Sequence, residues 1–110
     1  MRELTESEVT ELQWGDAEFT GYYWDSELKD PALVIRVKPS KSTFQELICF
    51  WATNLNLNLN YLDQVGSLRT WAVTFESLPE GRWRVLFDFA GQGSVEFECN
   101  SLAIRSALGA

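Results

Sequence analysis

Residues 71–107, WAVTFESLPEGRWRVLFDFAGQGSVEFECNSLAIRSA, decide the fold of this chain. Apolar and polar residues alternate along the segment, which is typical of strands that bury one face. Three turn signals interrupt the alternation, at Pro79-Glu80-Gly81, Gly91-Gln92-Gly93 and Asn100-Ser101. Short loops with a left-handed glycine join antiparallel neighbours. We therefore predict a four-stranded antiparallel meander.

The register of this meander follows from matching apolar faces across each turn. The first turn places Phe75 opposite Val85 and Glu76 opposite Arg84. A one-residue slip would bury charges, so one inner face is predicted, with Phe87 at its centre. The other predicted pairs are Val73–Phe87, Trp71–Phe89, Phe89–Val95, Phe87–Phe97, Val85–Cys99, Cys99–Leu102, Phe97–Ile104 and Glu96–Arg105.

Upstream, the same period of two predicts strands over residues 17–24, 33–38, 46–52 and 54–61. Residues 46–52 are apolar on both parities, which predicts a strand covered on both faces. In 54–61, NLNLNLNY, leucines occupy one face and asparagines the other. We interpret the asparagine row as a solvated outer face; the alternative is a platform for a polar ligand or glycan. Residues 25–31 are predicted to form a loop.

The first residues predict a short helix. Thr5 and Glu8 have the spacing of a capping box, and Leu4 and Val9 that of a hydrophobic staple. Gly15 is the predicted stop. The fold class is therefore α+β, mostly antiparallel β, with one strongly curved sheet of about seven strands and a short N-terminal helix. The chain is expected to form a single domain, 1–110.

Composition bounds the class of protein. The 110 residues are 45% hydrophobic and include five tryptophans, which excludes a disordered chain. No apolar run approaches the ~20 residues that span a bilayer, and the acidic N-terminus does not resemble a signal peptide. We expect a cytoplasmic protein whose Cys49 and Cys99 are reduced, buried thiols.

The net charge of −7 arises entirely in residues 1–30, where nine acids face two bases; residues 31–110 hold seven of each. Such a field repels nucleic acid and anionic membranes and favours a basic protein partner. The binding residues proposed on this basis are the helix acids and the aromatic strand with its acid: Glu6, Glu8, Glu11, Tyr22, Trp24 and Asp25. The alternatives are that these acids only confer solubility and that half of the aromatics face the core.

Few residues could carry chemistry. The chain has no histidine, no metal-binding cysteine spacing and no phosphate loop, so we expect no enzyme, no metal and no cofactor. Asp88 and Glu96 are predicted to face each other with Glu98 nearby, which could bind a proton or a divalent cation; we favour neutralisation by Arg84 and Arg105. An aromatic-lined cavity is conceivable around the tryptophans, although core packing is the default for Trp14, Trp51, Trp71 and Trp83.

Two functions are consistent with these observations. The first is a small non-enzymatic interaction module, one form being an inhibitor or immunity-type antitoxin that binds a basic partner. The second is a small-molecule-binding or enzymatic domain with an aromatic β-pocket and carboxylates. One contiguous acidic surface would favour the first, and a deep aromatic pocket with a buried carboxylate the second. A homodimer is also expected, through a sheet edge at 102–107 or at 17–24.

Overall fold

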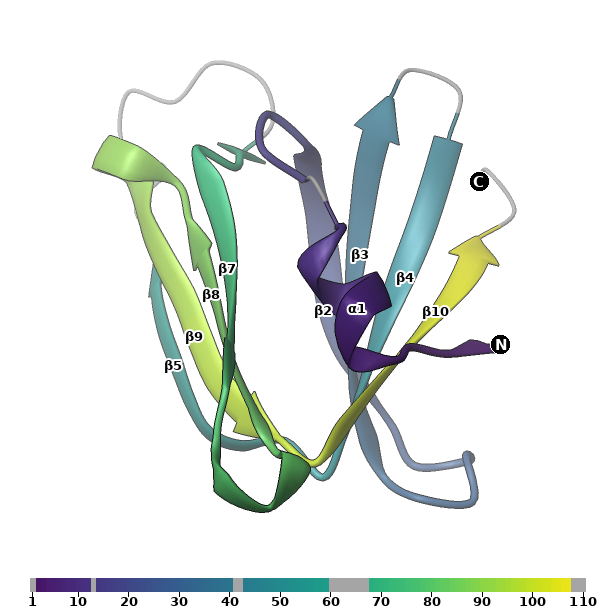
Figure 1. Ribbon diagram of the computed structural model, residues 1–110. Coiled ribbons are helices and arrows are strands. Elements are labelled where there is room, and N and C mark those ends of the chain that lie inside the picture. The colour runs from purple at the N-terminus through teal and green to yellow at the C-terminus, as the bar shows by residue number, and fades with distance from the viewer. Residues whose placement is uncertain (1, 13, 41–42, 60–67, 108–110) are drawn as a thin grey trace.

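The computed structural model describes residues 2–12, 14–40, 43–59 and 68–107. In this part of the chain, two antiparallel sheets face each other and one short helix, α1 (Glu6–Thr10), lies beside the space between them (Figure 1). The strands are β1 (Arg2–Glu3), β2 (Glu18–Asp25), β3 (Ala32–Ser40), β4 (Thr43–Phe50), β5 (Thr53–Leu59), β6 (Leu68–Arg69), β7 (Ala72–Ser77), β8 (Trp83–Asp88), β9 (Gly93–Cys99) and β10 (Ser101–Ala107).

One sheet has the strand order β1-β10-β4-β3-β2-β6, and the other has the order β5-β9-β8-β7. The chain leaves the first sheet after Phe50, adds the short β6 to its other edge, and returns to it at Asn100 to form β10. The crossings after Phe50 and at Asn100 lie side by side, because the Asn100 N–H donates to the Phe50 carbonyl over 2.9 Å. The prediction of a mostly antiparallel β protein is confirmed. One curved sheet of about seven strands is wrong, and a five-residue helix is too little for an α+β protein.

The first hairpin of the predicted meander is confirmed. Phe75 pairs with Val85, Val73 with Phe87 and Glu76 with Arg84. Trp71 is the exception: β7 begins one residue after it, and its side chain is 76% exposed instead of packing opposite Phe89.

The second hairpin is shifted by two residues from the prediction. Phe87 pairs with Val95, and Val85 with Phe97, because the loop is wider than expected and closes with the Phe89 N–H on the Gly93 carbonyl. The third hairpin is wrong. β10 leaves β9 and pairs with β4, for example through Leu102 and Cys49, because the chain crosses to the other sheet at Asn100. Alternation of apolar and polar residues determines which face of a strand is buried, but not which strand it pairs with. The errors in the second and third hairpins therefore changed the pairing and not the predicted buried face of these strands.

The main core fills the space between the sheets. Phe87 is fully buried there, as predicted, and its ring centroid lies 6.5 Å from that of Trp14 and 6.3 Å from that of Phe19. A second, smaller cluster covers the opposite face of the six-stranded sheet; it consists of Ala32, Val34, Ile48 and Ala103 beneath Leu28 and Phe50. The prediction that the 46–52 segment is buried on both faces therefore holds for β4.

The N-terminal capping box is confirmed. The Glu8 N–H donates to Thr5 Oγ1 over 3.3 Å, and the Thr5 N–H donates to Glu8 Oε1 over 3.1 Å. Leu4 and Val9 are buried as a staple requires. The helix ends at Thr10 and not near Gly15, because the chain must turn to bring Trp14 into the core.

The described part of the alternating segment 54–61 follows the prediction except at Leu57, which was expected on the buried face and is 38% exposed. Asn56 and Asn58 are exposed, and Leu55 and Leu59 pack against the core. Asn60 and Tyr61 lie outside the described residues. Cys49 and Cys99 are free thiols buried between the sheets.

Candidate functional site

The arginines of this molecule form ion pairs, whereas most of the acids in residues 1–30 do not. Every arginine forms an ion pair, with Glu8, Glu46, Asp16, Glu98 or Glu76. Of the nine acids in residues 1–30, only Glu8 and Asp16 are among these partners. The other seven form no ion pair within the described part of the chain; they are Glu3, Glu6, Glu11, Glu18, Asp25, Glu27 and Asp30. The uncompensated negative charge is therefore concentrated in the first 30 residues.

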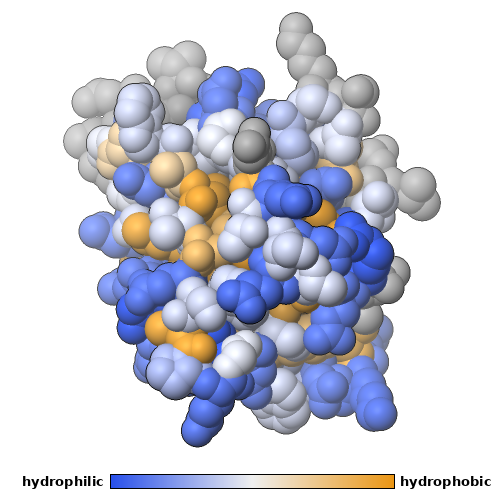
Figure 2. Space-filling model, viewed as in Figure 1, coloured by the Kyte–Doolittle hydropathy of each residue, from blue (hydrophilic) through white to orange (hydrophobic). Residues whose placement is uncertain are grey.

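These acids do not form the single contiguous surface that the sequence suggested. Glu3, Glu6 and Glu11 surround α1, whose Val9 packs into the core between the sheets. Asp25, Glu27 and Asp30 surround the β2–β3 connection, whose Leu28 packs on the outer face of the six-stranded sheet. The two groups thus belong to opposite faces of that sheet. On the face that carries α1, hydrophilic residues prevail, and apolar residues reach the surface between β7 and α1 (Figure 2).

Near α1, a groove of about 260 Å³ combines acids with an apolar floor. Glu3 and Glu6 line it together with three buried side chains, Leu4, Trp83 and Leu102. This composition suits a lysine or arginine side chain, whose methylene stem packs on apolar atoms while its charge stays near the carboxylates. Of the three helix acids proposed from the sequence, Glu6 lines the groove.

The other two helix acids have different surroundings. Glu8 is engaged in the capping box and in an ion pair with Arg2, so it is not a free binding group. Glu11 is exposed and follows the last helical residue. The sequence could not distinguish them, because spacing gives their place on a helix and not their partners.

Along β2, three consecutive aromatic side chains are exposed: Tyr22 at 41%, Tyr23 at 38% and Trp24 at 53%. Tyr22 and Trp24 are exposed, but they lie on the same sheet face as Phe19 and not on the opposite one, because the ladder is irregular between Phe19 and Gly21. The exposure of Tyr23 was not predicted. β2 pairs with β3 over its length but with β6 only at Glu18 and Phe19. Within the described residues, the segment 21–25 consequently has no strand on its second side. Asp25 ends this segment.

A cluster of polar and charged side chains around the buried Glu46, on the outer face of the same sheet, was not predicted. Glu46 is only 7% exposed; Arg105 Nε donates to its Oε1 over 2.8 Å, and Tyr23 Oη donates to its Oε2 over 2.9 Å. Arg36 Nε lies 3.5 Å from Oε2. The four residues come from β2, β3, β4 and β10, so the cluster joins four strands. The one sequence signal was a glutamate at the start of a doubly apolar strand.

The electrostatics of the cluster indicate a structural role. Burial, followed by the hydrogen bond to Glu46, raises the pKa of Tyr23. Burial by itself would lower the pKa of Arg105, but the hydrogen bond and charge of Glu46 outweigh it, so the net shift is upward. Both shifts keep the groups in the protonation states that the hydrogen bonds need.

The alternative carboxylate cluster is not assembled. Because of the two-residue shift, Asp88 lies opposite Ser94 and Glu96 opposite Leu86. The Asp88 side chain accepts from the Ala90 N–H over 2.8 Å, and Glu98 pairs with Arg82 at 3.5 Å. Of the two expected neutralising groups, Arg84 lies 3.9 Å from Glu98, whereas Arg105 lies in the other sheet. Within the described ranges, no three acids, cysteines or histidines come together in a way that could hold a metal ion.

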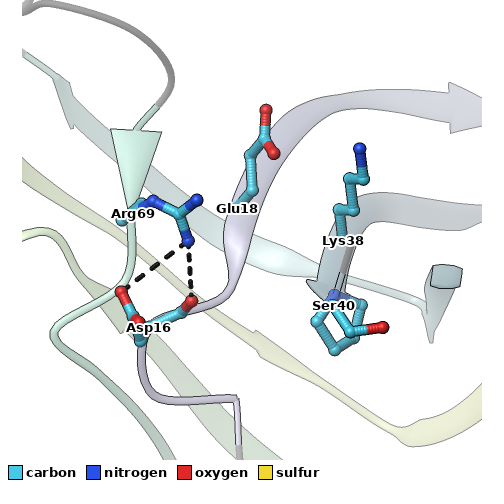
Figure 3. Close-up of a pocket in the computed structure, with 6 residues that line it drawn as sticks. Asp16, Glu18, Lys38, Ser40 and Arg69 are labelled. Atoms are coloured by element: carbon cyan, nitrogen blue, oxygen red, sulfur yellow. Dashed lines mark hydrogen bonds and ion pairs between the residues drawn. The ribbon is translucent and has the colours of Figure 1, made fainter. Parts of the chain in front are cut away.

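Among the described residues, the tryptophans do not gather around a common cavity, although Trp83 lines the groove near α1. Trp14 and Trp83 are buried in the core, whereas Trp51 and Trp71 are exposed. A hollow of about 320 Å³ does lie at the ends of β2, β3 and β6, and its charged lining residues are Asp16, Glu18, Lys38 and Arg69 (Figure 3). Arg69 donates to the Asp16 carbonyl over 3.1 Å and lies 3.7 Å from its carboxylate. Its lining contains no aromatic residue, unlike the predicted β-pocket.

Comparisons with protein-family models, with curated proteins and with solved structures return no match for this chain. Within the residues that the structure covers, no helix has the length and apolar character needed to cross a bilayer.

Proposed function

We propose that this protein is a non-enzymatic, cytoplasmic interaction module that binds a basic partner protein, as an inhibitor or an immunity-type antitoxin does. One observation carries the proposal: seven acids of the first 30 residues form no ion pair in the described structure, whereas every arginine does. Charges left uncompensated on a surface attract a partner of opposite sign and speed its association.

The groove beside α1 is the contact best suited to such a partner. Glu3 and Glu6 supply the charge, and Trp83 supplies an aromatic wall for a cationic side chain. Glu11 adds to the field without lining the groove. Glu8 is excluded because Arg2 already neutralises it.

The test compares two variants with the same change in net charge. In the first, Glu3, Glu6 and Glu11 are replaced by glutamine; in the control, Glu80→Gln, Asp88→Asn and Glu96→Gln remove three acids that also lack ion pairs in the described part. Each tagged protein is used to capture partners from a lysate of the producing organism. The association rate of each captured, purified basic protein is then measured at low and high salt.

The N-terminal variant should associate about tenfold more slowly at low salt, and the difference should shrink as salt screens the field. The control variant should behave like the unmodified protein. Equal rates for all three proteins would show that the N-terminal acids serve only solubility, and the proposal would be wrong.

A further inference from the structure

The groove beside α1 contains a hydrogen-bond donor that no part of the described chain uses. Trp83 is only 8% exposed, and the exposed part of its side chain lines the groove. Its indole N–H donates to no acceptor among the described residues. The nitrogen still reaches solvent, because Arg36 Nε is the one fully enclosed side-chain nitrogen or oxygen there that lacks a partner. Since a buried indole usually finds an acceptor, the Trp83 N–H is available to a group that enters the groove.

Asn100 supplies a second donor to the same groove. Its Oδ1 accepts from Arg82 Nε over 3.0 Å, so the oxygen of this amide is occupied, while its Nδ2 has no acceptor within the described structure. Amide and indole nitrogens only donate, whereas the ionised carboxylates of Glu3 and Glu6 only accept. The groove therefore matches an occupant that carries both a cation and a hydrogen-bond acceptor.

Building on the function proposed above, we propose that the groove binds an extended segment of the basic partner through one of its basic residues. The side chain of that residue reaches Glu3 and Glu6, and its backbone carbonyl accepts from the Trp83 N–H. A free ammonium or metal ion would satisfy the acids and leave the donors unpaired, which lowers affinity. The methylene stem of the basic side chain packs on Leu4 and Leu102.

Two other hollows of the molecule lack this combination. The hollow at the ends of β2, β3 and β6 contains Lys38 and Arg69, and Arg69 already pairs with Asp16. A hollow of about 520 Å³ near the end of β10 is lined by Arg2 and Arg105, and its described lining contains no acid. A basic side chain would meet cations in either place. Of these three hollows, the groove alone combines uncompensated acids with unused donors.

NMR spectroscopy of ¹⁵N-labelled protein tests this arrangement, because the indole N–H of each of the five tryptophans gives its own signal. Triple-resonance spectra of the unmodified protein assign the Trp83 signal. The probe is the peptide acetyl-Gly-Gly-Arg-Gly-Gly-amide. Two comparison probes separate its groups: the same peptide with neutral citrulline in place of arginine, and butylguanidinium, which has the cation but no carbonyl.

The arginine peptide should move the Trp83 indole proton downfield in a saturable manner, because the N–H engages a carbonyl. It should bind about tenfold more tightly than either comparison probe. Glu6→Gln should weaken its binding about fivefold. The matched control is Glu11→Gln, which changes the net charge equally but outside the groove, and it should weaken binding by less than about twofold.

Three results would overturn the proposal: no saturable shift at millimolar peptide, peptide binding that leaves the Trp83 signal unmoved, or equal affinity for butylguanidinium and the peptide. If one of them occurs while the variant with glutamine at positions 3, 6 and 11 still associates slowly with a captured basic partner, the acids act through their field alone. The function proposed above would then stand, and the peptide seat in the groove would be wrong.

Discussion

Phe87 is the residue on which the two layers of the molecule depend most. It is fully buried and packs against Trp14 and Phe19, which come from the N-terminal part of the chain. Phe87→Ala should lower the free energy of unfolding by about 3–5 kcal/mol, because it leaves a cavity in the core between the two sheets that the surrounding residues cannot close. Urea denaturation measures this loss.

The matched control is Leu86→Ala, one residue earlier on the outer face of the same strand, where the side chain is only half-buried. It should cost less than half as much as Phe87→Ala. Equal losses for the two variants would contradict the placement of Phe87 at the centre of the core.

Cys49 gives the stability of the protein a pH dependence. Burial, followed by the neighbouring Cys99 thiol, raises the pKa of Cys49 well above its usual range. In the unfolded chain this thiol ionises at about pH 8.5, while the folded protein keeps its proton. The contribution of the protonated Cys49 thiol to the free energy of unfolding is therefore fully present below about pH 8.5. It is lost as pH rises above that value, by at most about 1.4 kcal/mol per pH unit.

Urea denaturation from neutral to moderately alkaline pH measures this slope. Cys49→Ala removes the group, so the variant should lose stability less steeply above about pH 8.5 than the unmodified protein. Parallel pH profiles for the two proteins would show that the Cys49 thiol does not contribute.

At the scale of elements, the pairing of β5 with β9 depends on one glycine. Gly93 opens β9 with φ of 107°, and a Cβ there would lie 1.7 Å from the Asn58 carbonyl oxygen. Gly93→Ala should therefore destabilise the protein by at least about 2 kcal/mol, because strained backbone and a steric clash add together. Gly91→Ala, in the same loop, meets open space and should change stability by less than about 0.5 kcal/mol. Thermal unfolding of the two variants tests the contrast, and equal shifts in Tm would refute it.

Local signals predicted elements better than they predicted sheets. The capping box at Thr5 and Glu8 needs residues three positions apart, so the sequence contains it completely. The hairpin at Pro79–Gly81 is equally local, and its register was correct. The pairing of β10 with β4 joins segments that are far apart in the chain, and alternation is the same whether Leu102 faces Cys99 or Cys49. Which strand β10 pairs with depends on how the whole chain divides into two sheets, and not on the local sequence.

For the whole molecule, the sequence revealed where the charge is but not which charges are free. The excess of acids in residues 1–30 needs only counting. That Glu8 is neutralised while Glu6 is not, and that Glu46 is buried among two arginines and a tyrosine, depends on neighbours from distant strands. The exposed Tyr23 was missed because the irregularity between Phe19 and Gly21 moves it to the sheet face opposite that of Phe19, which alternation alone does not show.

The position of β10 inside the six-stranded sheet, and not at its edge, has a consequence for synthesis of the protein. This strand is translated after all the others, yet it lies between β1 and β4 and joins them. A chain still attached to the ribosome cannot complete the six-stranded sheet before residues 101–107 have left the exit tunnel. Until that moment β4 has an open edge beside the apolar Leu47 and Ile48, and nascent chains with such edges are the ones that chaperones protect from aggregation. Folding of this sheet is therefore completed only after β10 has emerged.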